Sequence, residues 1–145
     1  MTKSTDPAPD TQSVVIEKNF PHPPEKLWRA LTETKLLAQW LMNNDFEPVA
    51  HHKFQFRADP LPQWNGIIDC EVLLIDPPKT LSYTWNSLGL GSVVLFTLTP
   101  VEAGTHLRME HSGFGPDQQQ AYKGATYGWQ NFLTNLDRVL TEVSQ

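Results

Sequence analysis

The residues of this chain best suited to chemistry are His111 and Tyr83, each in a segment with the period-two pattern of a β-strand. Alternation places His111 on the same face as Leu107 and Met109, the face expected to point inward. Three roles are open to such a histidine: a core residue satisfied by a backbone carbonyl or by Tyr83, a group that orients a ligand, or a general acid–base catalyst.

The other reactive residue types form no motif for catalysis or metal binding. The sequence has no Gly-x-Ser-x-Gly elbow and no glycine loop of the phosphate-binding kind, and few carboxylates fall on inward faces. His51 and His52 are adjacent rather than spaced for chelation, and Cys70, the single cysteine, lies in an apolar run typical of a buried thiol. We expect no catalytic residue, no metal and no cofactor, although the sequence does not decide whether the protein is an enzyme.

A long C-terminal helix is expected to hold these groups in place. Residues 117–143 carry apolar side chains at steps of three and four, with Asp117 as a capping residue and Gln120 three residues later. Such a helix needs a sheet to cover its apolar face. That face carries Tyr122, Ala125, Trp129, Phe132, Leu133, Leu136, Val139, Leu140 and Val143.

The first half of this helix is rich in small residues, among them Ala121, Gly124, Ala125 and Gly128. Each glycine costs about 1 kcal/mol relative to alanine inside a helix, so a compensating role is expected. The two candidates are close packing of the helix backbone against the sheet and space for a ligand.

The rest of the chain predicts one strand, two short helices and then a meander of strands. Prolines end the first strand, and Pro24 and Thr34 are suited to begin the two helices, Thr34 as an N-cap. The expected strands are 14–20, 46–57, 66–75, 80–85, 93–101 and 105–112, and the expected helices are 24–31 and 34–41.

Aromatic residues near strand ends, loops and the small-residue half of the helix are candidates to line a pocket. Trp28 and Trp129 are expected in the core instead. The predicted ligand-binding residues are Trp40, Phe54, Phe56, Trp64, Tyr83, Trp85, Met109, His111, Phe114, Tyr122 and Ala125.

Composition limits the classes of partner. The 145 residues fit one domain, expected over 14–143, after a polar tail at 1–13 that is expected to be disordered. A net charge of −5 gives no broad basic field for nucleic acid or anionic membranes, and no run is long enough to span a bilayer. We expect a cytoplasmic protein that does not insert into membranes and is a monomer or weak homodimer.

Several ordered segments together resemble the START-like helix-grip proteins, and more narrowly the family of homologues of the activator of heat-shock-protein-90 ATPase. The segments are VIEKNFPHPPEKLWRALT at 15–32, LAQWL at 37–41, IDPPKTLSYTW at 75–85, GTHLRM at 104–109, HSGF at 111–114 and GW at 128–129. The resemblance implies an α+β fold in which a curved antiparallel sheet wraps around the C-terminal helix, with two short helices after the first strand and a cavity between sheet and helix. The chain departs from the family pattern at Ala50–Lys53, where the family tends to have glycines, so the hairpin there must bend differently or carry a bulge.

Three functions are compatible with these observations. The first is a small-molecule binding protein whose cavity holds a hydrophobic, aromatic or lipid-like ligand. The second, suggested by the family alone, is a co-chaperone or protein-interaction domain in the stress response, with a chaperone as partner and an exposed patch as its mark. The third is an enzyme of the polyketide-cyclase type, which requires His111 and Tyr83 to reach one water-accessible cavity.

Overall fold

Two short helices follow the first strand in the computed structural model, which describes residues 12–62, 64–87 and 89–142. Residues 1–11 of the expected tail lie outside this range, whereas Gln12 and Ser13 belong to the first strand because they pair with the end of the last one. The elements are β1 (Gln12–Phe20), α1 (Pro24–Thr32), α2 (Thr34–Trp40), β2 (Asn43–Asn44), β3 (Lys53–Arg57), β4 (Ile67–Asp76), β5 (Thr80–Ser87), β6 (Leu90–Val101), β7 (Gly104–Phe114) and α3 (Gln119–Glu142).

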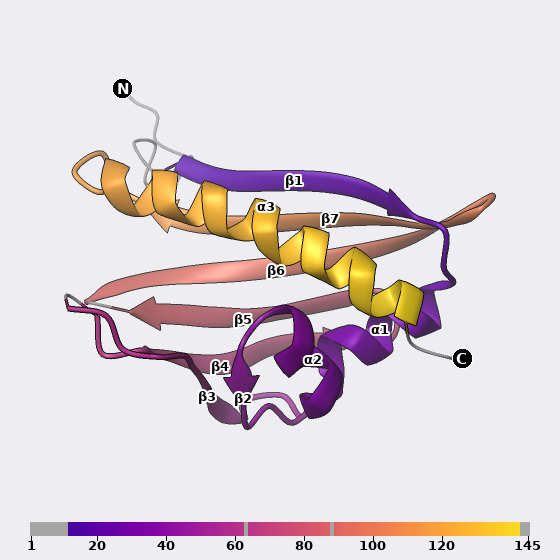
Figure 1. Cartoon of the computed structure of the whole chain (residues 1–145), viewed down its shortest axis with the longest axis horizontal. Helices are drawn as coiled ribbons and strands as arrows, with labels where there is room; N and C mark the ends of the chain where they lie inside the picture. The colour runs from indigo at the N-terminus through magenta and orange to yellow at the C-terminus, as the bar shows by residue number, and fades with distance from the viewer. Residues whose placement is uncertain (1–11, 63, 88, 143–145) are drawn as a thin grey trace.

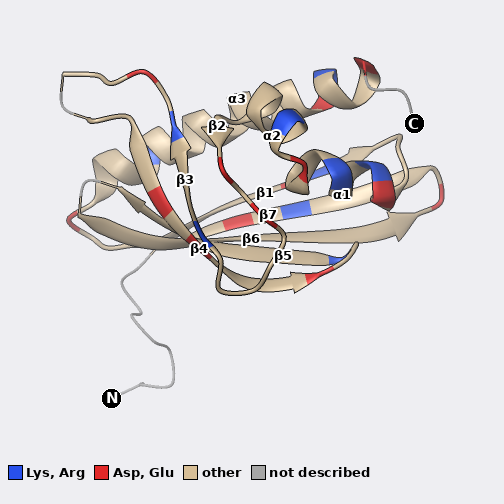
Figure 2. Cartoon of the chain, turned by 90° about the horizontal axis from the view of Figure 1, so that it is seen from below, with Lys and Arg blue, Asp and Glu red and all other residues tan. Residues whose placement is uncertain are grey.

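The strands form one antiparallel sheet in the order β1-β7-β6-β5-β4-β3-β2. The three helices lie on the same face of this curved sheet, and α3 runs along its whole length (Figures 1 and 2). Buried residues from both layers, including Trp129 and Leu136 of α3 and Phe96 and Leu107 of the sheet, form the core between them. The predicted α+β helix-grip fold is confirmed.

The two short helices meet at Glu33, which explains why one capping prediction fails. Pro24 begins α1 as predicted, but Thr34 is the first residue of α2 rather than its N-cap. Glu33 is both the C-cap of α1 and the N-cap of α2. Its backbone N–H donates to the carbonyl of Arg29, and its carbonyl accepts from the N–H of Leu37. The Thr34 hydroxyl instead donates to the carbonyl of Phe46, 3.4 Å away.

The expected strand at 46–57 is much shorter in the structure. Only Lys53–Arg57 forms β3, and the two-residue strand β2 pairs with its end. The preceding segment turns at His51, which adopts a φ of 70°, a conformation usually left to glycine. Of the two alternatives expected at Ala50–Lys53, a different bend or a bulge, the chain shows a bend, and it is made by a histidine rather than a glycine.

Helix α3 also begins two residues later than predicted. Its first residue is Gln119, so Asp117 lies outside the helix and is not its cap. Gln118 precedes the helix instead: its backbone carbonyl accepts from the N–H of Tyr122, and its side-chain oxygen accepts from the N–H of Gly115. The last predicted residue of the helix, Val143, lies outside the described residues.

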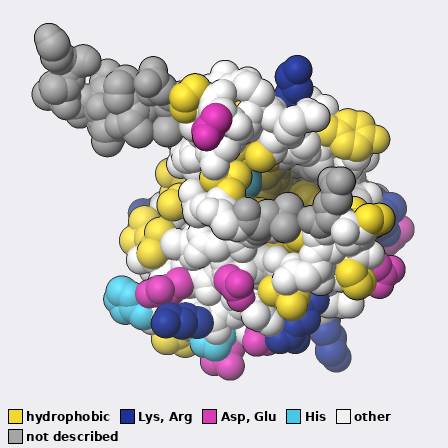
Figure 3. Space-filling view, turned by 90° about the vertical axis from the view of Figure 1, so that its left-hand side faces the viewer, with side chains coloured by type: hydrophobic (Ala, Val, Ile, Leu, Met, Phe, Trp, Pro, Cys, Tyr) yellow, Lys and Arg dark blue, Asp and Glu magenta, His cyan; other side chains and the backbone are white. Residues whose placement is uncertain are grey.

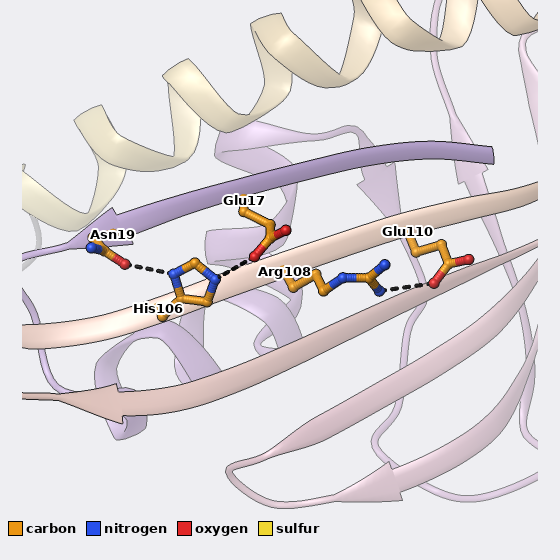
Figure 4. A network of polar contacts seen from close by, with 5 residues as sticks. All are labelled: Glu17, Asn19, His106, Arg108 and Glu110. Carbon is orange, nitrogen blue, oxygen red and sulfur yellow. Dashed lines mark hydrogen bonds and ion pairs between the residues drawn. The ribbon is translucent and has the colours of Figure 1, made fainter.

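Polar residues of β1 and β7 cover the outer face of the sheet. His106 lies between Asn19 and Glu17, with nitrogen–oxygen distances of 2.6 and 2.8 Å, and Arg108 pairs with Glu110 at 2.8 Å (Figure 4). These residues alternate with the buried Leu107, Met109 and His111, as predicted for β7. Exposed pairs of this kind contribute little to stability but mark the register of the two strands.

Charged residues of both signs are interspersed over the described part of the chain (Figure 2). Within that part, none of the helices combines the length and the hydropathy needed to cross a bilayer.

Candidate ligand-binding site

A pocket of about 450 Å³ lies where the β5–β6 hairpin, the end of β7 and the start of α3 meet. Figure 3 looks onto this end of the molecule and shows a hollow with hydrophobic side chains inside it. The volume is within the range of about 300–1,000 Å³ that is typical of small-molecule sites. The described residues that line the pocket are Trp85, Ser87, Leu90, Ser92, His111, Phe114, Asp117, Gln118, Gln120, Ala121 and Ala125.

Ser92 and His111 are the deepest polar residues of this lining, and we call them the floor of the pocket. Both are buried, with exposed fractions of 5 % and 2 %. They are neighbours because β6 and β7 are paired with Val93 opposite Ser112. Ser92 Oγ lies 2.7 Å from His111 Nε2, and it also donates to the carbonyl of Trp85 at 2.7 Å.

The indole of Trp129 determines which nitrogen of His111 carries the proton. An indole nitrogen can only donate, and Trp129 Nε1 lies 2.9 Å from His111 Nδ1, so Nδ1 must accept. The imidazole proton is therefore on Nε2 and is donated to Ser92 Oγ. The result is a chain of three hydrogen bonds: Trp129 donates to His111, His111 donates to Ser92, and Ser92 donates to the carbonyl of Trp85.

Burial keeps His111 neutral. Loss of solvent lowers the pKa of this imidazole to about 4, because the charged form is poorly solvated in the core. The hydrogen bond from the Trp129 indole also favours the neutral form of His111, because a protonated Nδ1 could not accept it.

The pair Ser92–His111 has the residue types and the spacing of a nucleophile and its base, but the hydrogen bond between them runs in the opposite direction. A base must accept the serine proton, whereas His111 Nε2 already carries a proton and donates it. Neither nitrogen is free to take up a proton from a substrate. The geometry therefore favours the first of the three roles left open for His111, a satisfied core residue, although its partners are Trp129 and Ser92 rather than a carbonyl or Tyr83.

Aromatic rings form the walls around the floor. The ring of Trp85 lies 5.3 Å from that of Trp129 and 5.4 Å from the His111 ring, between ring centroids. The ring of Phe114 lies 4.8 Å from that of His111, and Tyr122 packs edge-on against Phe114 at 5.8 Å. These contacts hold the walls in one arrangement.

The alanines of α3, and not its glycines, leave the space for the pocket. Ala121 and Ala125 line it, whereas Gly124 and Gly128 do not. A Cβ added at Gly124 would meet nothing within 4 Å, and one at Gly128 would meet only Phe132, at 3.8 Å. Neither glycine approaches the sheet closely or borders the pocket, so neither explanation expected from the sequence fits.

The predicted site residues divide into three groups. Four of them line the pocket: Trp85, His111, Phe114 and Ala125. Tyr122 is in the second layer, behind Phe114, and Trp64 is half-buried in the loop between β3 and β4. The others, Trp40, Phe54, Phe56, Tyr83 and Met109, are buried in the core.

Two of these buried aromatics illustrate the difference between core and pocket. Trp40 ties α2 to α1, because its indole nitrogen donates to the carbonyl of Ala30 at 2.8 Å. Tyr83 is fully buried among Phe46, Phe54 and other rings, and burial raises the pKa of its hydroxyl well above the usual value. Its hydroxyl finds no hydrogen-bond partner among the described residues.

Sequence reasoning found His111 but missed the other polar residues that line the pocket. Ser92 is the clearest case, because a serine next to a glycine carries no signal until the pairing of β6 with β7 places it beside His111. Asp117 and Gln120 were predicted only as helix-capping residues, and Gln118 was not predicted at all. The described residues contain no cluster of three or more potential metal ligands.

A helix-grip fold with a partly apolar pocket under the start of its long helix defines a class of protein, and comparison with known proteins gives the family. Residues 21–141 match the family model described as Activator of Hsp90 ATPase homolog 1-like protein, and the chain belongs to that family. A search of curated proteins found no match.

Solved structures agree with this assignment. Protein MLL2253 from Mesorhizobium loti is 52 % identical, with a TM-score of 0.86 over 92 % of this chain and 100 % of that one. Protein BH1534 from Bacillus halodurans is 27 % identical, with a TM-score of 0.75 over 89 % and 96 % of the two chains. The Aha1 dimer from Colwellia psychrerythraea is 24 % identical, with a TM-score of 0.78 over 89 % and 96 %, and shares the fold.

Proposed function

We propose that this protein binds a hydrophobic small molecule, aromatic or lipid-like, in the pocket between the β5–β6 hairpin, β7 and α3. The observation that carries the proposal is a pocket of about 450 Å³ that is lined by Trp85, Leu90 and Phe114 and has the buried polar pair Ser92–His111 at its floor. Such a combination is the usual form of a small-molecule site.

Burial of apolar surface supplies the affinity in this proposal. Each Å² of ligand and wall removed from water contributes about 25 cal/mol, before the cost of immobilising the ligand is subtracted. Trp85, Leu90 and Phe114 in the lining offer such surface. Because the ring contacts already fix the walls, the protein loses little side-chain freedom on binding.

Binding is better supported than catalysis. The cyclase-like alternative required Tyr83 and His111 to reach one cavity, but Tyr83 is fully buried and is not among the residues that line the pocket. His111 has both nitrogens engaged and a low pKa. The co-chaperone alternative rests on the family name. The large exposed apolar side chains are spread over β1, β4, β6, α3 and the loops on either side of β3: Val15, Val49, Leu61, Leu73, Leu74, Val101 and Tyr127.

A variant that fills the pocket tests the proposal. Ala125→Phe places a ring in the space left by the alanine, whereas Asn131→Phe adds the same ring on the exposed side of α3. Binding of a panel of neutral bicyclic and tricyclic aromatics, sterols and fatty alcohols is measured by calorimetry and by shifts of the tryptophan indole NMR signals.

We expect saturable binding of at least one class to the natural protein and to Asn131→Phe, and a loss of tenfold or more in Ala125→Phe. Indole shifts should be large for Trp85 and Trp129 and small for Trp40, which is tied to Ala30 away from the pocket. No binding by any class, or equal binding by both variants, would contradict the proposal.

A further inference from the structure

We propose that the pocket selects ligands with a hydrogen-bond donor at their buried end and without negative charge, such as neutral or cationic hydroxy- and amino-aromatics. This inference rests on the proposed function, because it concerns the ligand of the same site. It follows from the direction of the hydrogen bonds at the floor and from the charges around it.

The floor can accept a hydrogen bond but cannot donate one. Ser92 has one proton and two lone pairs. Its proton is used on the carbonyl of Trp85, and one lone pair accepts from His111 Nε2. What remains for a ligand is the second lone pair, which accepts from an O–H or N–H group.

His111 has no hydrogen-bonding capacity left for a ligand. Nδ1 accepts from Trp129, and the Nε2 proton is donated to Ser92. A ligand carbonyl or ether oxygen that reached the floor would therefore meet a lone pair and lose its bond to water without replacement. Such an unpaired buried group is costly.

The charges near the pocket disfavour carboxylates. Among the described residues that line it, none is a lysine or arginine, and the one charged side chain is Asp117. The first turn of α3 begins at this rim and carries a partial positive charge, but the full negative charge of Asp117 lies two residues before it. A carboxylate entering the pocket would lose hydration without gaining a cation.

Three naphthalenes of similar size test the proposal: 2-naphthol, 2-methoxynaphthalene and 2-naphthoate. Dissociation constants are measured at pH 7 by NMR titration of the natural protein. We expect 2-naphthol to bind roughly two- to tenfold more tightly than the ether, the range of one neutral hydrogen bond, and 2-naphthoate to bind more weakly than the ether.

Variants assign the preference to the floor and the rim. Ser92→Ala removes the acceptor and leaves His111 Nε2–H facing the pocket, so the advantage of 2-naphthol over the ether should disappear. Ser92→Thr keeps a hydroxyl and should keep the advantage. Asp117→Asn should strengthen binding of 2-naphthoate relative to the two neutral compounds.

The outcomes separate this inference from the function on which it rests. If none of the three compounds binds, the proposed function fails for ligands of this class, and the inference fails with it. If they bind but the ether or 2-naphthoate equals 2-naphthol, or if Ser92→Ala keeps the advantage, the pocket is a binding site and the inference is wrong.

Discussion

At the scale of single residues, the direction of one hydrogen bond distinguishes a catalytic histidine from a structural one. His111 and Ser92 lie as close as a catalytic pair, yet the indole of Trp129 determines which imidazole nitrogen holds the proton. Strand alternation could predict that His111 points inward. It could not predict the tautomer, because Trp129 and Ser92 reach His111 only after the sheet and α3 have come together.

The depressed pKa of His111 predicts a pH dependence of stability. The folded protein resists protonation down to a pKa of about 4, whereas an unfolded histidine titrates near 6.5. Between these values the unfolded state binds more protons, so the free energy of unfolding falls as the pH is lowered from about 6.5 to about 4, by about 3 kcal/mol in total.

Urea unfolding at several pH values measures this effect, and His111→Gln serves as the control because glutamine can still accept from the Trp129 indole. The difference in unfolding free energy between the two proteins should shrink towards pH 4. A difference that does not change with pH would contradict a neutral, buried His111.

The buried hydroxyl of Tyr83 predicts a stabilising substitution. Because this hydroxyl finds no partner among the described residues, Tyr83→Phe removes an unpaired polar group and keeps the ring contacts. We expect the free energy of unfolding to rise by about 1 kcal/mol in thermal or urea unfolding. A loss of stability would mean that the hydroxyl has a partner, such as a buried water.

At the scale of elements, α3 shows which features of a helix can be predicted. Its apolar spacing gave the buried face correctly, including Trp129, Leu133, Leu136, Val139 and Leu140. Its start was wrong by two residues: the helix begins at Gln119, and the side-chain oxygen of the preceding residue, Gln118, accepts from the N–H of Gly115. The roles expected for the glycines also failed, since helical spacing does not say how far the sheet lies from each position.

The glycines of α3 predict a gain in stability. Gly124→Ala and Gly128→Ala should each raise the free energy of unfolding by about 1 kcal/mol, because the added methyl group meets open space or an ordinary contact. Ligand binding should be unchanged, since neither residue lines the pocket. Destabilisation by either change, measured by urea unfolding, would show that the helix packs more closely there.

In the turn before β3, we expect glycine substitutions at two adjacent residues, His51 and His52, to change the free energy of unfolding in opposite directions. His51 has a φ of 70°, which costs about 1–2 kcal/mol for a residue with a side chain, and its contact with Glu71 is an exposed one of 3.7 Å. His51→Gly should therefore stabilise the protein by about 0.5–1 kcal/mol after the extra flexibility of unfolded glycine is subtracted.

His52→Gly is the matched control, because His52 does not have a positive φ and its ring nitrogen lies 3.2 Å from the carbonyl of Asp45. This change should destabilise the protein. Equal effects of the two substitutions in thermal unfolding would argue against strain at His51.

At the scale of the whole molecule, the fold could be predicted and the site only in part. Periodicity and ordered motifs were enough for the helix-grip architecture, because they reflect which faces are buried. They could not separate Trp85 and Phe114, which line the pocket, from Phe54 and Phe56, which fill the core, since all four are inward-facing aromatics. That distinction depends on where α3 leaves the sheet uncovered. The oligomeric state, a monomer or weak homodimer, stays a prediction.

The most direct test of a non-catalytic, hydrogen-bonded floor is the state of His111 in solution. Long-range ¹H–¹⁵N NMR spectra of the imidazole nitrogens distinguish the two neutral tautomers and the charged form. We expect His111 to stay neutral from pH 7 to pH 5, with the proton on Nε2 and Nδ1 accepting from Trp129. A proton on Nδ1, or protonation of the ring near pH 6.5, would contradict the hydrogen-bond chain and reopen a role for His111 in acid–base catalysis.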